Sequence, residues 1–205
     1  MPSPWTDGHA FLLQDRHFAP LVKRVGPPDL RAPRGSVFAS LTAAIVYQQL
    51  AGKAALTIHG RVVEALGGRV TPQAVLAADR ETLRGAGLSR NKLAAILDLA
   101  EKATAGTVKL RGLSRLPDDA VVAHLTRVRG IGRWTSEMFL MFNLHRPDVW
   151  PVGDLGVRSG WARIHGLGEP LDAKAMEEVA DHLRPWRSAA AWYCWRAVEV
   201  LTPRG

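Results

Sequence analysis

Apolar residues recur at helical spacing along nearly the whole chain, and glycine and proline divide the pattern into segments. The spacing predicts a first helix over 11–25, which ends at the turn Gly26-Pro27-Pro28. Further helices are expected over 37–49, 53–66 and 90–104. Almost every segment has the periodicity of a helix that buries one face.

Residues that favour helix N-caps stand where these segments begin. Ser36 and Ser89 precede two of the longer helices. The other predicted starts lie at Thr71-Pro72, Asp79, Asp154, Asp172 and Pro185. Only 107–113 has a pattern that an extended segment would share, so we predict an all-α fold.

Composition narrows the class of partner. The 205 residues include 27 Lys and Arg against 19 Asp and Glu, which gives a formal net charge of +8. Such an excess favours a polyanion, because each neutralised phosphate of a nucleic acid releases counterions. A basic soluble protein without such a partner is the alternative that charge alone leaves open.

The chain has one cysteine, Cys194. A single thiol excludes an internal disulfide, a cysteine-rich zinc site and a four-thiolate iron–sulfur cluster. No apolar run approaches the ~20 residues of a membrane span, and the N-terminus lacks the basic-then-apolar order of a secretory signal. We expect a cytoplasmic, nucleoid-associated protein with no membrane partner.

The most informative segment is a turn with two glycines between two helices, expected at about 117–144. Gly130 and Gly132 permit a tight reversal, because glycine tolerates positive φ and lacks a Cβ atom. Ile131 between them can anchor the turn to the core. The N–H groups that begin the second helix would then bind a DNA phosphate without reading sequence.

This segment is a candidate helix–hairpin–helix motif. The hairpin residues expected to contact the DNA backbone are Arg129, Gly130, Ile131, Gly132, Arg133 and Thr135. An ordinary helix–turn–helix corner is the alternative, and it would account for an isolated pair of glycines. A longer pattern surrounds this pair.

That longer pattern is the run Gly130-Ile131-Gly132-Arg133-Trp134-Thr135, followed by Arg146-Pro147-Asp148-Val149-Trp150-Pro151-Val152-Gly153-Asp154. It resembles the helix–hairpin–helix superfamily of DNA glycosylases, and within it 3-methyladenine DNA glycosylase II, the AlkA type. The resemblance covers about 36–196. It implies an enzyme of base excision repair that flips alkylated purines out of duplex DNA and hydrolyses their N-glycosidic bond.

Asp154 is ambiguous from the residues alone, because aspartate is a favoured N-cap. The resemblance implies that Asp154 is the catalytic carboxylate, which would stabilise positive charge on the sugar and orient water. Glu137 ranks second among the acids, as a pocket or polar-network residue. Asp148 is interpreted as a turn residue.

The position of Trp134 separates two branches of this superfamily. Relatives with lyase activity carry a lysine there, whose amine attacks the sugar. Tryptophan has no such nucleophile, and the cysteines of the iron–sulfur branch are absent. The resemblance therefore implies a monofunctional enzyme without an iron–sulfur cluster. It also implies a candidate site for Na⁺ or K⁺ at the carbonyls of Val128 and Gly130.

Several side chains are candidates for the base pocket and the DNA wedge. The predicted pocket residues are Trp134, Met138, Trp186, Glu137 and Tyr47, and Met138 stands where relatives can carry tyrosine. An indole would stack on a cationic alkylated purine, although each tryptophan alone is more often a core residue.

The run Ile45-Val46-Tyr47-Gln48-Gln49-Leu50-Ala51-Gly52 resembles the family's wedge segment. It implies that Leu50 fills the space left by the extruded base. Gln48 and Gln49 would face the lesion or its partner base. A helix-end core role for Leu50 is the alternative.

The expected architecture is two helical lobes, 1–35 with 147–205 and 36–146, with the hairpin and Asp154 at a cleft between them. AlkA-type enzymes can carry an N-terminal β domain, for which this chain has no room. The expected partner of a monomer is duplex DNA with alkylated bases. The rival functions are a non-enzymatic DNA-structure binder and a mismatch or oxidised-base glycosylase of the same superfamily.

Overall fold

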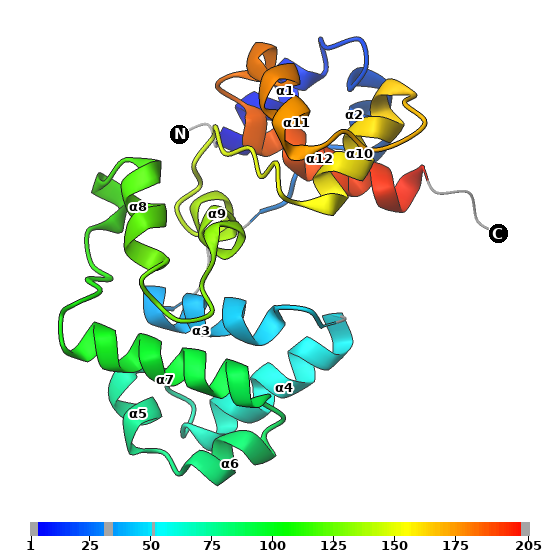
Figure 1. The fold of residues 1–205 in the computed structure, drawn as a ribbon. Coiled ribbons are helices and arrows are strands. Elements are labelled where there is room, and N and C mark those ends of the chain that lie inside the picture. Colours follow the sequence, from blue (N-terminus) through cyan, green and yellow to red (C-terminus); the bar gives the residue numbers. More distant parts are fainter. Residues whose placement is uncertain (1–3, 31–34, 51, 202–205) are drawn as a thin grey trace. The chain divides into compact units, whose positions relative to one another are not determined.

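The computed structural model describes residues 4–30, 35–50 and 52–201, and every regular element in these ranges is helical (Figure 1). The predicted all-α class is therefore confirmed. The segment 107–113, whose pattern an extended segment would share, forms no strand. There the Val108 N–H donates to the carbonyl of Lys102 across 3.1 Å, so the chain turns back on the preceding helix. None of the described helices is both long and apolar enough to cross a membrane.

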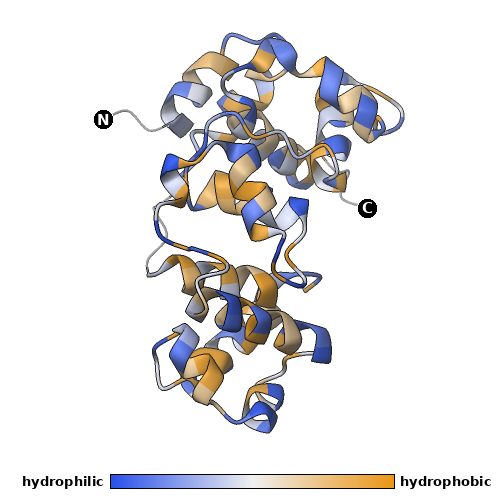
Figure 2. Ribbon diagram, turned by 60° about the vertical axis from the view of Figure 1, so that its left-hand side comes forward, coloured by the Kyte–Doolittle hydropathy of each residue, from blue (hydrophilic) through white to orange (hydrophobic). Residues whose placement is uncertain are grey.

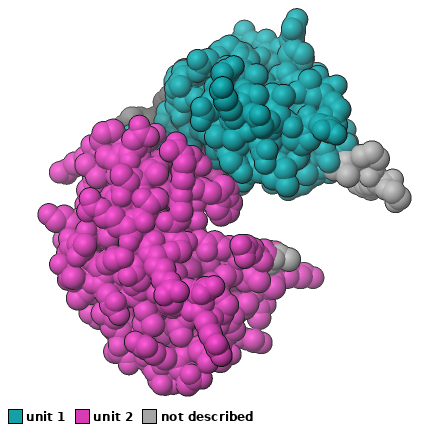
Figure 3. Space-filling model, viewed as in Figure 1, with its two compact units in different colours: residues 1–32, 144–205 teal, residues 33–143 magenta. Residues whose placement is uncertain are grey.

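The chain forms two compact units, which are described separately (Figure 3). Unit 1 comprises Met1–Ala32 and Leu144–Gly205, and unit 2 comprises Pro33–Asn143. The predicted boundaries between the two lobes are after residues 35 and 146. In the structure the two units divide after residues 32 and 143. Unit 1 thus joins the two ends of the chain, and unit 2 is its continuous middle.

Unit 2 is built around the helices Val37–Tyr47 and Arg90–Thr104, which pack against each other. Its elements are α3 (Val37–Tyr47), α4 (Gly52–Ala65), α5 (Pro72–Ala77), α6 (Arg80–Gly85), α7 (Arg90–Thr104), η1 (Leu113–Arg115), α8 (Asp118–Leu125) and α9 (Arg133–Phe142). Helix α3 contacts α4, α7 and α9, and α5 and α6 contact α7. The helices turn apolar faces inward and polar faces outward (Figure 2).

The helix starts of unit 2 confirm the predicted caps. Ser36, Thr71, Asp79 and Ser89 each accept a hydrogen bond from the backbone N–H three residues further on. Each cap satisfies a donor that the helix itself leaves without a partner. The register of these helices could therefore be predicted to within a residue at their N-termini.

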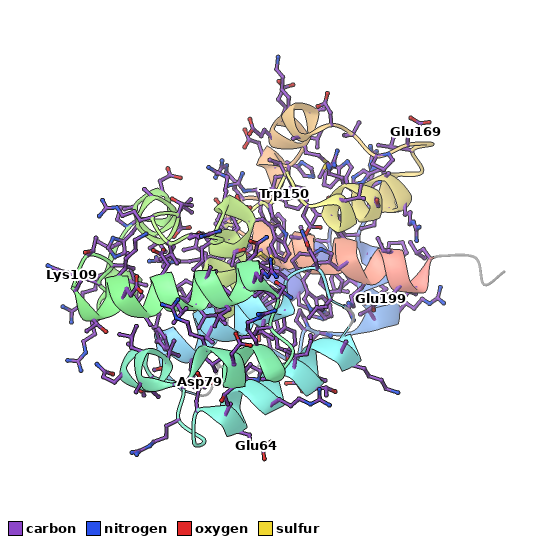
Figure 4. All side chains as sticks on the ribbon, turned by 60° about the horizontal axis from the view of Figure 1, so that its bottom comes forward. Glu64, Asp79, Lys109, Trp150, Glu169 and Glu199 are labelled. Carbon is purple, nitrogen blue, oxygen red and sulfur yellow. The ribbon has the colours of Figure 1, made fainter. Side chains whose placement is uncertain are left out.

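Helix α12 (Arg187–Val200) is the centre of unit 1. The other elements are α1 (Pro4–Leu12), α2 (Ala19–Val25), α10 (Leu155–His165), α11 (Ala173–Val179) and η2 (Asp181–Leu183). Helix α12 contacts α10, α1 and α2. Trp150 lies in the interior, whereas labelled charged side chains such as Glu169 and Glu199 reach outward (Figure 4).

The first predicted helix is two helices. The prediction of one helix over 11–25 is wrong, because the carboxylate of Asp15 accepts the N–H groups of His17 and Phe18 across 2.9 and 3.0 Å. These bonds turn the chain between α1 and α2. Phe18 is fully buried. The apolar pattern therefore predicted its burial correctly but did not predict the break between the two helices.

Candidate functional site

The hairpin of unit 2 is a seven-residue connection between α8 and α9, from Thr126 to Gly132. The first helix ends at Leu125, and the second ends at Phe142, two residues before the end predicted for the motif. Gly130 has φ +77°, and a Cβ atom there would lie 3.0 Å from the Cβ of Ala95 on α7. Glycine is therefore needed at residue 130 for both conformation and space.

The start of α9 suits an external anion. Gly132 is its N-cap and supplies no side-chain oxygen to the first-turn N–H groups. Arg129 is exposed, and Arg133 has a 70% exposed side chain, so both add positive charge at this end. Ile131 is buried and holds the turn to the core, as expected.

Thr135 differs from the other hairpin residues. Its side chain is buried, and its Oγ1 accepts a hydrogen bond from Gln48 Nε2 across 3.0 Å. A DNA contact by Thr135 would therefore have to use its backbone N–H.

Two residues that sequence reasoning missed hold the hairpin backbone to α7. The Asp98 carboxylate accepts the Arg129 N–H across 2.7 Å and Lys102 Nζ across 2.8 Å. Lys102 Nζ also donates to the carbonyl of Arg127. Burial raises the pKa of Asp98, but the bonds from Lys102 and Arg129 outweigh it and lower that pKa overall. The only sequence signal was an i, i+4 acid–base pair, which is usually a solvated surface pair.

The hairpin carbonyls that the sequence proposes as ligands of a monovalent cation both accept hydrogen bonds. The Val128 carbonyl accepts the Ile131 N–H across 3.1 Å, and the Gly130 carbonyl accepts Gln48 Nε2 across 3.0 Å. Each carbonyl oxygen has a second lone pair, and neutral oxygens suit hard cations. These donors therefore fit Na⁺ or K⁺, and the site stays a prediction.

The wedge segment begins in the last turn of α3 and continues beyond the end of that helix at Tyr47. Tyr47 and Leu50 are 38% and 37% exposed, Gln49 has φ +55°, and Gln48 is half-buried. The exposure of Leu50 argues against the alternative that it is a core residue. The amide of Gln48 points at the hairpin, where the sequence interpretation had it facing a base.

Helix α9 carries three of the predicted pocket residues. The Trp134 indole is 44% exposed and Met138 is half-buried. Glu137 is buried, and its Oε1 accepts Arg133 Nε across 2.9 Å. Glu137 therefore takes part in a polar contact, one of the two roles expected for it. The fourth residue in this unit, Tyr47, has its ring near that of His59, with centroids 5.9 Å apart.

Asp154 in unit 1 is the N-cap of α10, as predicted. Its Oδ1 accepts the N–H of Val157 across 2.8 Å and the indole Nε1–H of Trp195 across 3.0 Å. The side chain is half-buried. Burial raises the pKa of the Cys194 thiol, and the charge of Asp154 raises it further. Two donors thus fix the orientation of a carboxylate at a helix N-terminus.

Gly156 makes the contact between Asp154 and Trp195 possible. A Cβ atom at residue 156 would lie 2.8 Å from Cδ1 of Trp195 and 3.0 Å from Oδ1 of Asp154. One turn further on, a Cβ at Gly160 would lie 1.9 Å from the carbonyl oxygen of Cys194. The two glycines let α10 and α12 approach closely enough for the indole to reach the carboxylate.

The loop that leads to Asp154 is attached to the start of α12. Arg187 donates to both carboxylate oxygens of Asp148, across 2.6 and 3.0 Å, and Arg184 donates to one of them across 2.6 Å. Ser188 Oγ accepts the Val149 N–H across 2.9 Å. Asp148 lies in a turn, as predicted, and two guanidinium groups also converge on its carboxylate, which the sequence did not indicate.

Trp195 is the aromatic residue beside Asp154, and sequence reasoning missed it. The sequence pointed to Trp186, whose Cβ would lie 3.6 Å from a Cβ at Gly8 of α1. Trp186 is the N-cap of α12 and precedes the helix, whereas Trp195 lies within it. Trp186 is half-buried, and its pocket role stays a prediction.

Comparison with known proteins adds three findings. Residues 42–185 match the model of a family described as "HhH-GPD superfamily base excision DNA repair protein". DNA-3-methyladenine glycosylase 1 of Schizosaccharomyces pombe is 33% identical over 191 residues, which cover 91% of this chain and 84% of that protein. DNA-3-methyladenine glycosylase 2 of Escherichia coli is 29% identical over 182 residues, which cover 82% of this chain and 60% of that protein.

A solved structure is similar over nearly the same length. The 3-methyladenine DNA glycosylase Mag1 of Schizosaccharomyces pombe, in complex with abasic DNA, matches with a TM-score of 0.86 and 32% identity. The match covers 95% of this chain and 98% of the Mag1 chain.

Proposed function

Because this chain belongs to the HhH-GPD superfamily of base excision DNA repair proteins, we propose that it is a DNA glycosylase that removes alkylated purines from duplex DNA. The observation that carries the proposal is the Asp154 carboxylate, which the Val157 N–H and the Trp195 indole hold in one orientation. A fixed anion is what an N-glycosidic bond needs at the sugar when it breaks.

The reaction is a hydrolysis. The bond between C1′ and the base nitrogen breaks, and its electron pair leaves with the base. Positive charge then develops on the sugar, where the carboxylate of Asp154 stabilises it. Water adds to C1′ and loses a proton, for which Asp154 is the acceptor that we propose. The products are the free base and an abasic site.

Water is the proposed nucleophile because of the residue at position 134. Tryptophan supplies no amine, so this helix offers no Schiff-base step at that position. The exposed indole is instead suited to stack on an extruded base, and its π face favours a purine that alkylation has made cationic. Met138 and Tyr47 would border the same base, and Glu137 is held by its ion pair with Arg133.

Binding to duplex DNA is assigned to the hairpin. The N-terminus of α9 and the side chains of Arg129 and Arg133 would contact phosphates, and the net charge of +8 would favour the encounter. The carbonyls of Val128 and Gly130 would hold a monovalent cation, which supplies further positive charge when bound. We propose that the protein acts as a monomer on the chromosome.

The test is release of free base from methylated duplex DNA, with the products identified by mass. The proposal predicts release of 3-methyladenine, 7-methylguanine or a related alkylated purine, and an equal yield of abasic sites. Tight DNA binding without release would instead support the non-enzymatic DNA-structure binder. Release only from mismatched or oxidised duplexes would support the other glycosylase class.

A further inference from the structure

Gln48 connects the wedge segment to the hairpin within unit 2. Its Nε2 donates to the carbonyl of Gly130 and to Oγ1 of Thr135, both across 3.0 Å. Gln48 is half-buried, whereas Gln49 and Leu50 beside it are exposed. One amide group therefore holds the glycine turn and the first turn of α9 at the same time.

The segment that Gln48 anchors has little local support of its own. Gln49 has φ +55°, a backbone region that residues other than glycine rarely adopt. The Leu50 N–H reaches the carbonyl of Tyr47 only across 3.4 Å. Such a conformation persists only when surrounding contacts impose it.

Anchors outside the segment supply those contacts. On the α3 side, Lys92 Nζ at the start of α7 donates to the carbonyl of Val46 across 2.7 Å. Burial at this position lowers the pKa of Lys92. On the hairpin side, the anchor is the amide of Gln48. The exposed Leu50 thus lies two residues after Gln48, which is attached to the hairpin turn.

We propose that Gln48 is a positioning residue that couples the hairpin to Leu50, so that phosphate binding by the hairpin fixes the direction from which Leu50 enters the duplex. This inference rests on the proposed function, because it takes Leu50 as the wedge. Gln48 acts through the protein, since its amide Nε2 donates to both hairpin residues.

The experiment replaces Gln48 with methionine, which has similar length, no charge and no donor. The matched control is Gln73→Met, an exposed glutamine on α5. The affinity of each variant is measured for a duplex with a tetrahydrofuran abasic-site analogue and for the same duplex without it. Thermal unfolding of each variant shows that it is folded.

The proposal predicts that Gln48→Met loses about tenfold of the preference for the abasic analogue. Affinity for the intact duplex and its salt dependence should stay the same, because the phosphate contacts remain. Gln73→Met should behave as the original protein does. Release of alkylated base by the original protein is measured in parallel, so that failure of the proposed function is seen separately.

Two further comparisons separate positioning from direct contact with DNA. In a Leu50→Ala background, Gln48→Met should have no additional effect, because its action passes through Leu50. Thr135→Val should lose part of the preference, and Thr135→Ser, which keeps the hydroxyl, should retain it.

Any of three results would overturn the inference while leaving the glycosylase intact. These are an unchanged preference in Gln48→Met, an equal loss of affinity for both duplexes, and additive effects with Leu50→Ala.

Discussion

The indole N–H of Trp195 donates to Oδ1 of Asp154 across 3.0 Å, and this contact joins the middle of α12 to the N-cap residue of α10. The same oxygen accepts the N–H of Val157. A side chain that serves only as a cap needs the second of these bonds but not the first. The contact from Trp195 therefore suggests that the orientation of the carboxylate matters beyond its role in helix capping.

Replacement of Trp195 with phenylalanine should slow base release. The ring is kept and the N–H is lost, so Oδ1 of Asp154 loses the donor that reaches it from α12. A hydrogen bond to a charged group contributes about 1.5–3 kcal/mol, which corresponds to a decrease in kcat of about tenfold to a hundredfold. Single-turnover rates measure the change, and Trp192→Phe on the same helix is the control. A fall in DNA affinity with an unchanged rate would contradict the positioning role.

Gly156→Ala should reproduce the defect of Trp195→Phe. The new Cβ would meet Cδ1 of Trp195 at 2.8 Å, so the indole has to move away from Asp154. The double variant should be no slower than the slower single variant, since both changes remove one contact. Gly168→Ala, where nothing lies within 4 Å of the new atom, is the control. Independent, multiplicative effects on the rate would show that Gly156 acts elsewhere.

Arg187→Lys should destabilise unit 1. Lysine cannot donate to both oxygens of Asp148 as the guanidinium does. Because the Arg187 side chain is only 13% exposed, we expect a loss of about 1–3 kcal/mol in the free energy of unfolding. Arg184→Lys, at a side chain that is 51% exposed, should cost less than about 1 kcal/mol. Equal losses in denaturant titrations would mean that the bidentate contact has no special weight.

Asp98 should make hairpin stability depend on pH in the acid range. Its pKa in the folded protein is lowered, so its stabilisation is complete above the unfolded value of about 3.9 and is lost as pH falls through the folded pKa. The difference in unfolding free energy between the original protein and Asp98→Asn should be largest above about pH 5 and should shrink toward pH 3. A difference that is independent of pH would show that the charge of Asp98 contributes nothing.

The sequence was sufficient for those elements whose signals are local. Ser36, Ser89 and Asp154 could be predicted as caps because an N-cap bond spans only three residues. The family resemblance, which depended on the hairpin and the residues up to Asp154, is confirmed by the comparisons. The helix break at Asp15 was missed because its bonds to His17 and Phe18 compete with a continuing helix.

Contacts between distant segments were beyond a local reading of the chain. Nothing near Trp195 in the sequence distinguishes it from Trp186, and only the packing of α12 on α10 brings it to Asp154. Gln48 and Gln49 are chemically identical neighbours, yet only the hairpin's position directs the amide of Gln48 inward. Both cases depend on tertiary packing, which single-residue patterns do not encode.

The decisive experiment compares the original protein with Asp154→Asn in single-turnover release of alkylated purine from duplex DNA. Asparagine is as good an N-cap as aspartate, so the variant keeps the start of α10 and loses only the charge. We predict a rate at least about a hundredfold lower, with unchanged affinity for the duplex. A variant that releases base at the original rate would contradict the assignment of Asp154 as the catalytic carboxylate.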